Sequence, residues 1–297
     1  MTTLADLAEL VRAPAALSVP GDVVAGAAAA GALGPRTPAL AGASVLLYWA
    51  GMAANDWADR GLDAVERPER PIPSGRVTPA AAVGLAAGLT VAGVGLAAAV
   101  GGRRAAALAV PLAASIWGYD LLAKNTAAGP AVMAVCRGLD VLLGASGGRV
   151  TRALPAAVTV AAHTWTVTAL SRREVSGADA ALPMRTLAGT ALVAASAAIP
   201  PARPADQTGV RNGPARVAAA LPAVLAGWYA ARYGAAQVEV VRDPSAGRVR
   251  TAVGAGITGL PALQGALTAR GGAGLLGLAV AAAAPLGRRL ARKVSPT

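Results

Sequence analysis

Apolar residues gather into ten long runs along the chain, and short polar stretches between them hold most of the charged residues. Each run could cross the hydrocarbon core of a bilayer, which is about 30 Å thick and needs about 20 helical residues. The runs cover residues 16–34, 38–55, 79–100, 104–122, 129–147, 153–171, 184–201, 214–234, 249–268 and 271–288, the last two being the weakest. Strand-like alternation of apolar and polar residues is absent over any useful length. We therefore predict an all-α polytopic membrane bundle of nine or ten transmembrane helices.

Composition supports a single membrane domain. Of the 297 residues, 55% are hydrophobic and only 14% are charged, and the mean hydropathy is +0.53. Glycine and proline are spread through the apolar runs, as transmembrane helices tolerate, rather than collected in a linker. We expect one domain over residues 1–297. Heavy use of Ala and Arg and the absence of Phe are typical of GC-rich coding and indicate a bacterial cytoplasmic membrane as the location.

The net charge of +12 would suggest nucleic acid as a partner of a soluble protein. Here the arginines lie in short loops between apolar runs, where they set topology and contact anions, so we predict no nucleic-acid partner. With the N-terminus inside, the cationic residues modestly favour the inner, cytoplasmic side. The first dozen residues lack a cleaved signal, so the first helix is expected to stay as an anchor. The single Cys136 excludes an internal disulfide and is expected to be a small buried residue.

An acid-rich motif, N-D-x-x-D-x-x-x-D, ends the second apolar run and is formed by Asn55, Asp56, Asp59 and Asp63. A helix turns about 100° per residue, so the three aspartates would lie within about 60° of one another. Carboxylates this close repel one another unless a cation lies between them, and an all-oxygen set suits Mg²⁺. Magnesium in turn suggests a phosphate-bearing substrate. The alternative is a solvated helix end whose acids pair with Arg60 and Arg67.

Two further inner loops carry charged groups. In the first, Asp120 and Lys124 lie one helical turn apart, so they form a local ion pair unless Lys124 binds a phosphate. The second holds Arg172, Arg173, Glu174 and Asp179. Its two acids are about 140° apart on an ideal helix, so they share a ligand only if the chain breaks between them; otherwise the arginines neutralise them. Acids for metal and cations for the remaining oxygens are what a magnesium-chelated diphosphate needs.

A few polar residues fall inside apolar runs. Arg137 and Asp140 are three apart and could neutralise each other, or Asp140 could be a cavity acid that positions or deprotonates an acceptor. His163 is expected to be packed and hydrogen-bonded rather than a general base. Gln264 is a candidate for lining a cavity. Small residues at four-residue spacing, such as Gly84 with Gly88, are expected to let helices approach closely.

The acid-rich motif, together with the R-P-I-P-S-G-R segment at residues 70–76, resembles the UbiA superfamily of membrane prenyltransferases. The resemblance spans nearly the whole chain, and Tyr119, Lys124, Arg12 and Pro14 also resemble residues of that family. It implies a helical bundle, usually of nine spans, around a central cavity. It further implies an isoprenyl diphosphate bound through Mg²⁺ between two acidic motifs, and transfer of the allylic group to an acceptor. The Ser-Arg-Arg-Glu-Val and Cys-Arg-Gly-Leu segments resemble a bacterial subset whose acceptors are poorly defined.

The resemblance assigns roles to individual residues. The metal ligands would be Asn55, Asp59, Asp63, Glu174 and Asp179. The diphosphate would be contacted by Arg60, Lys124 and Arg172 or Arg173, and Asp56 would support catalysis. Asp140 is a second catalytic candidate that comes from its place in an apolar run and not from the resemblance. The second acidic motif departs from the family's usual D-x-x-x-D, because Glu174 and Asp179 are more widely spaced.

The predicted function is Mg²⁺-dependent transfer of an isoprenyl group from its diphosphate to a lipophilic or aromatic acceptor in the bilayer. The competing class is a transporter or lipid carrier that uses the acids as a cation site. The R-P-I-P-S-G-R loop and the gathering of acids at one surface argue against it. A phosphatidyl-type transferase would carry a D-G-x-x-A-R opening, which this chain lacks. The hydropathy excludes a soluble terpene synthase, and the loops indicate neither the acceptor, the prenyl length nor the oligomeric state.

Overall fold

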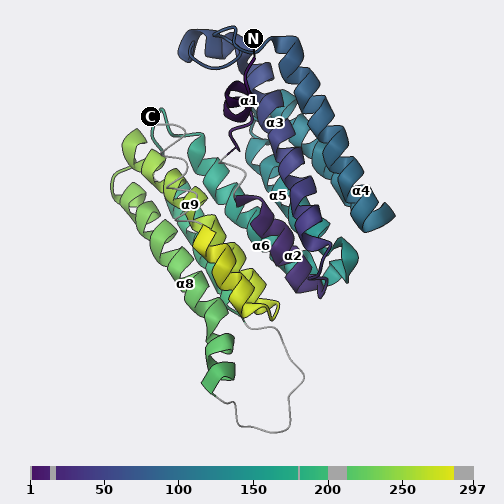
Figure 1. The fold of residues 1–297 in the computed structure, drawn as a ribbon. Coiled ribbons are helices and arrows are strands. Elements are labelled where there is room, and N and C mark those ends of the chain that lie inside the picture. The colour runs from purple at the N-terminus through teal and green to yellow at the C-terminus, as the bar shows by residue number, and fades with distance from the viewer. Residues whose placement is uncertain (1, 14–17, 180, 200–212, 284–297) are drawn as a thin grey trace.

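The computed structural model describes residues 2–13, 18–179, 181–199 and 213–283, which contain helices and connecting turns but no strand. In chain order the elements are α1 (Leu4–Leu10), α2 (Pro20–Ala30), α3 (Thr37–Glu66), α4 (Pro79–Gly118), η2 (Tyr119–Ala123), α5 (Gly129–Gly144), η3 (Ala145–Gly147), α6 (Val150–Ser171), α7 (Ala181–Ala198), α8 (Gly213–Arg242) and α9 (Ala246–Arg270). A short apolar helix follows at Gly274–Ala283. In Figure 1 the helices form one bundle, with α3 and α4 on one side and α8 and α9 on the other. The prediction of an all-helical bundle is confirmed.

Within the described residues, each of the ten predicted apolar runs is largely helical, and α4 with the following turn η2 contains two of them. The helix bends sharply at Gly102, whose φ of 65° and ψ of −158° are readily adopted only by glycine. Beyond the bend, Trp117 Nε1 donates a hydrogen bond to Thr90 Oγ1 at 3.0 Å, although these residues are 27 positions apart. In a straight helix they would be about 40 Å apart. The two arms of α4 therefore fold back on each other as a hairpin.

The helices contact one another in a closed ring. From α3 the ring passes through α4, α5, α6, α7, α8 and α9 to α2, which contacts α3 again. Large apolar side chains such as Val91, Leu192 and Val224 lie exposed on the outside, as expected for side chains that face lipid. Among the described residues, four helical stretches are long and apolar enough to cross a membrane: Thr37–Glu66, Pro79–Ala123, Gly129–Gly147 and Val150–Ser171. The chain is thus an integral membrane protein.

The backbones of α2 and α5 nearly touch. A Cβ placed on Gly26 would lie 1.8 Å from the carbonyl oxygen of Val141, and one placed on Gly144 would lie 2.0 Å from that of Val23. Small residues allow such contacts between membrane helices. Gly84 and Gly88, by contrast, have no described atom within 4 Å of an added Cβ. The prediction that this second pair mediates close helix packing is wrong.

Replacing Gly144 with alanine is expected to destabilise the protein by about 3 kcal/mol, because the new methyl group would overlap the backbone of α2. The matched control is Gly88→Ala, which adds the same methyl group on an open helix surface and should leave stability unchanged or slightly improved. Thermal unfolding of the two variants in one detergent measures the difference. Equal Tm values would show that α2 and α5 are not in close contact.

Candidate active site

The acid-rich motif lies on the last turns of α3, which continues to Glu66, well past the apolar run that ends at residue 55. Helical geometry divides the four residues into two pairs. Asn55 and Asp59 are one turn apart and partly exposed, whereas Asp56 and Asp63 are two turns apart and buried, with 4% and 1% of their surfaces exposed. The motif therefore presents two differently solvated surfaces rather than one face.

The buried pair is neutralised by arginines. Arg70 lies between the two acids, with Nη1 at 2.7 Å from Asp63 Oδ2 and 3.4 Å from Asp56 Oδ1. Arg12 Nη2 contacts Asp56 Oδ1 at 2.8 Å, and Arg67 lies 3.6 Å from Asp63. Buried charges are stable only when they are paired in this way. Neither Arg12 nor Arg70 was among the predicted diphosphate contacts, because their partners depend on the folded loop.

The partly exposed pair faces the turn that follows α4. Lys124 Nζ contacts Asp59 Oδ1 at 2.5 Å, and Asn55 Nδ2 donates to Asp120 Oδ1 at 3.2 Å. Lys124 therefore pairs with an acid of α3. The predicted ion pair between Lys124 and its neighbour Asp120 is not present among the described residues.

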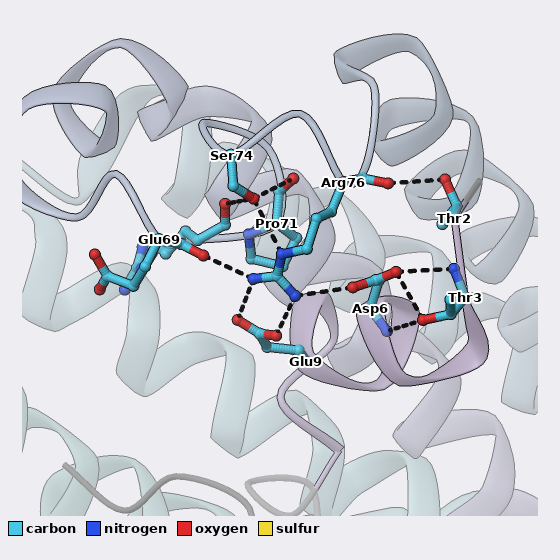
Figure 2. A network of polar contacts seen from close by, with 9 residues as sticks. Thr2, Thr3, Asp6, Glu9, Glu69, Pro71, Ser74 and Arg76 are labelled. Atoms are coloured by element: carbon cyan, nitrogen blue, oxygen red, sulfur yellow. Dashed lines mark hydrogen bonds and ion pairs between the residues drawn. The ribbon is translucent and has the colours of Figure 1, made fainter.

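Residues 2–13, which we call the N-terminal strap, contact the segment that follows α3, and Figure 2 shows this network around Arg76. Arg76 donates to both carboxylate oxygens of Glu9, at 2.7 and 3.0 Å, and to Asp6 at 2.8 Å. Hydrogen bonds from the side chain and backbone of Thr3, with help from Arg76, lower the pKa of Asp6 to about 2. Asp6 is therefore ionised at neutral pH. The strap continues to Arg12, whose φ of 47° is in the left-handed region and whose guanidinium contacts the acid motif.

The second acidic segment does not join the first. Asp179 Oδ1 accepts hydrogen bonds from the backbone amides of Ala181 and Leu182, so it caps the start of α7. Glu174 is partly buried, which raises the pKa of its carboxyl group, and its carbonyl accepts from Arg250. No contact between either acid and the motif on α3 is present among the described residues. Their predicted role as ligands of a second metal stays a prediction.

The other predicted diphosphate contacts are engaged elsewhere or exposed. Arg60 stacks over the ring of Trp57 at 4.9 Å and donates to its carbonyl. Arg172 donates to the carbonyl oxygens of Lys124 and Thr126, which links the end of α6 to the turn after α4. Arg173 is exposed. Of this predicted group, only Lys124 directly contacts the acid motif.

A second polar cluster lies inside the bundle. Arg137 Nε pairs with Asp22 Oδ2 at 2.8 Å, and Gln264 donates to Asp22 Oδ1 at 2.7 Å. Asp140 accepts from Ser44 at 2.5 Å and is completely buried. The predicted pair between Arg137 and Asp140 is thus replaced by a pair across helices. Asp140 has no exposed surface in this form, so its predicted contact with an acceptor stays a prediction.

His163 is buried and packed, as predicted. It shares a hydrogen bond of 2.9 Å with the hydroxyl group of Tyr229, and its ring makes edge contacts with Tyr229 and Tyr233. His163 belongs to α6 and the two tyrosines belong to α8, so these contacts join the two helices. This environment gives His163 a packing role.

The donor atoms at the end of α3 suit Mg²⁺, because carboxylate and amide oxygens are available there. In the described part of the chain, no three acidic, His or Cys side chains converge to form a metal site by themselves. Protein-bound Mg²⁺ commonly uses only one or two carboxylates, together with substrate phosphates and water. Asn55 and Asp59 therefore fit an ion that arrives with a diphosphate.

Comparison with known sequences identifies the family to which the chain is similar. The profile of the UbiA prenyltransferase family matches residues 18–239. A digeranylgeranylglyceryl phosphate synthase of Halobacterium salinarum is 34% identical over 155 residues, covering 49% of this chain and 54% of that protein. The enzyme of the same name from Natronomonas pharaonis is 42% identical over 85 residues, covering 28% of this chain and 31% of that protein. The chain thus spans at most about half the length of these curated relatives, which are archaeal.

Solved structures show the same fold. A structure described as giving insight into digeranylgeranylglyceryl phosphate synthase in membranes matches with a TM-score of 0.66 at 14% identity, covering 90% of this chain and 97% of that one. The apo structure of a UbiA homologue from Aeropyrum pernix K1 matches with a TM-score of 0.55 at 20% identity, covering 82% and 96%. At these identities the likeness establishes the helical architecture.

Proposed function

Because the chain belongs to the UbiA prenyltransferase family, we propose that it transfers an isoprenyl group from a magnesium-bound isoprenyl diphosphate to the hydroxyl group of a membrane lipid. The observation that carries this proposal is the arrangement at the end of α3. There, an exposed carboxylate, Asp59, is paired with a cation, Lys124, that has no second acid within ion-pair distance among the described residues. Such a pair can be separated by a ligand that carries both a metal and phosphate oxygens.

When the substrate binds, Asp59 and Lys124 would separate, and each would contact the substrate complex instead. Asp59 and Asn55 would hold the metal, and Lys124 would turn from Asp59 to a diphosphate oxygen. Asp63, the third predicted ligand, would stay paired with Arg70, and Asp56 would stay paired with Arg12. These two arginines would therefore contribute positive charge close to the diphosphate. Charge-assisted hydrogen bonds to phosphate are among the strongest polar contacts in proteins.

The chemistry requires stabilisation of a leaving group. Heterolysis of the carbon–oxygen bond leaves its electron pair on the diphosphate, and bound Mg²⁺ would neutralise part of that developing charge. Lys124 and the neighbouring arginines, already oriented by the fold, would stabilise the rest. The allylic carbon then bonds to the acceptor oxygen, whose proton is released to the diphosphate. These steps do not depend on Asp140, which is completely buried and whose catalytic role stays a prediction.

The acceptor is proposed to carry a glyceryl phosphate group. The curated relatives are named for the synthesis of digeranylgeranylglyceryl phosphate, and the loops beside the acid motif hold surplus arginines that would favour an anionic lipid headgroup. The bacterial source and the cytoplasmic position of the site stay predictions.

The test uses purified protein in lipid vesicles with Mg²⁺, a radiolabelled isoprenyl diphosphate and a monoprenyl glyceryl phosphate. The expected result is a labelled lipid with two prenyl chains and one diphosphate released for each lipid formed. The control replaces the acceptor with one whose free hydroxyl group is methylated, which should form no product. Movement of the labelled compound across the vesicle membrane without diphosphate release would support a transporter instead.

A further inference from the structure

Asp120 is a carboxylate of the site that neither the acid-rich motif nor the proposed mechanism includes. It lies in η2, a π-helical turn at the end of the second arm of α4, and only 6% of its surface is exposed. Single π-helical turns occur often at functional sites, because the extra residue redirects side chains. Here the turn places Lys124 against Asp59 and Asp120 against Asn55. These two residues of α3 are one helical turn apart.

Asp120 has no cation within ion-pair distance in the described part of the chain, although Lys124 belongs to the same turn. Its recorded side-chain partner is the amide group of Asn55, which donates to Oδ1 at 3.2 Å. The other oxygen, Oδ2, would lie only 3.5 Å from a Cβ placed on Gly51. Gly51 therefore leaves room for this carboxylate to pack against α3. A buried carboxylate held against an amide rather than a cation requires an explanation.

The hydrogen-bonding chemistry of the Asn55 amide explains why a carboxylate lies next to it. A primary amide has a donor end and an acceptor end on opposite sides. With Nδ2 held by Asp120, the Asn55 oxygen points away from that carboxylate and is left to bind another group. A carboxylate can only accept at this position, so it cannot hold the amide in the reverse orientation.

We propose that Asp120 is a positioning residue that fixes the Asn55 amide with its oxygen toward the metal-bound diphosphate. This inference rests on the proposed function, because it requires Asn55 to be a metal ligand. Groups that orient metal ligands typically change metal affinity about 10- to 100-fold when removed.

The test measures metal binding rather than turnover. Mn²⁺ binding in the presence of inorganic pyrophosphate is followed by electron paramagnetic resonance for the wild type, Asn55→Ala, Asp120→Ala, Asp120→Asn and the double alanine variant. We expect each single alanine variant to weaken Mn²⁺ binding about 10- to 100-fold. We expect the double variant to bind no more weakly than Asn55→Ala, because a positioning residue has no effect once its ligand is gone. Asp120→Asn keeps an acceptor oxygen for the Asn55 amide but adds a donor that can hold the reversed amide, so it should restore binding only in part.

The variants separate the possible failures. If Asn55→Ala binds Mn²⁺ as the wild type does, Asn55 is not a ligand and the proposed metal site itself is wrong. If Asn55→Ala is impaired but Asp120→Ala is not, only the positioning role is overturned. If Asp120→Asn is as weak as Asp120→Ala and the double variant is weaker still, Asp120 binds the metal directly and the positioning role is again overturned. Matching Tm values across the set ensure that folded proteins are compared.

Discussion

Asp59→Asn is expected to lower kcat/KM for diphosphate release by about 10³-fold, the scale typical of losing one group that stabilises charge in the transition state. The substitution keeps the size of the side chain and removes its charge. Asp59 is the acid of the motif whose cation partner, Lys124, comes from another helix, and it is a quarter exposed, with 25% of its side chain open. Without its charge the protein loses both a metal ligand and the group that orients Lys124. Diphosphate release from a radiolabelled substrate measures the effect.

The matched control is Glu66→Gln, which removes an acid from the last residue of the same helix, where the side chain is exposed. Its activity should stay within about twofold of the wild type, since exposed charges away from a site contribute little. The double variant Asp59→Asn, Lys124→Met removes the cation that Asp59→Asn leaves unpaired. It should be as stable as the wild type but still inactive. Full activity of Asp59→Asn would show that the metal and diphosphate bind elsewhere.

Arg70→Met is expected to cause the largest loss of stability, about 3 kcal/mol, because removing one partner of a buried ion pair leaves an uncompensated charge. Arg70 is the only residue that contacts both Asp56 and Asp63 among the described residues, and these acids are almost fully buried. Thermal unfolding in detergent gives the shift in Tm.

The control for this effect is Arg67→Met. Arg67 contacts only Asp63, at 3.6 Å, and its side chain is 53% exposed, so its loss should cost less than about 1 kcal/mol. Adding Asp63→Asn to Arg70→Met removes one of the unpaired acids and should restore part of the lost stability. If Arg67→Met and Arg70→Met lowered Tm equally, the burial of the Asp56 and Asp63 pair would not be what makes Arg70 important.

The fold was largely predictable because hydropathy depends on residues close together in the sequence. In the part of the chain that the structure describes, all ten apolar runs are largely helical, and the hairpin of α4 falls between two runs, where Gly102 permits the turn. Which helix faces make contact was not predictable in this way. Gly84 and Gly88 show the four-residue spacing of a close contact yet lie open, whereas Gly26 and Gly144, far apart in the sequence, bring α2 and α5 together.

The acids of the candidate site were predictable from the sequence, but the residues that pair with them were not. The acids of α3 form a local motif, so their type and spacing already indicated magnesium and phosphate. Their partners do not follow from spacing. Lys124 lies one turn from Asp120 but pairs with Asp59, and Arg137 lies near Asp140 but pairs with Asp22. Rules for neighbours on one helix cannot anticipate ion pairs between helices, because these depend on how the bundle closes.

A structure of the protein with Mg²⁺ and a non-hydrolysable isoprenyl thiodiphosphate tests the central claim most directly. The account predicts that the metal binds Asp59 and the Asn55 oxygen, and that Lys124 leaves Asp59, 2.5 Å away here, to donate to the diphosphate. A bound analogue located away from α3, with the pair between Lys124 and Asp59 intact, would contradict it.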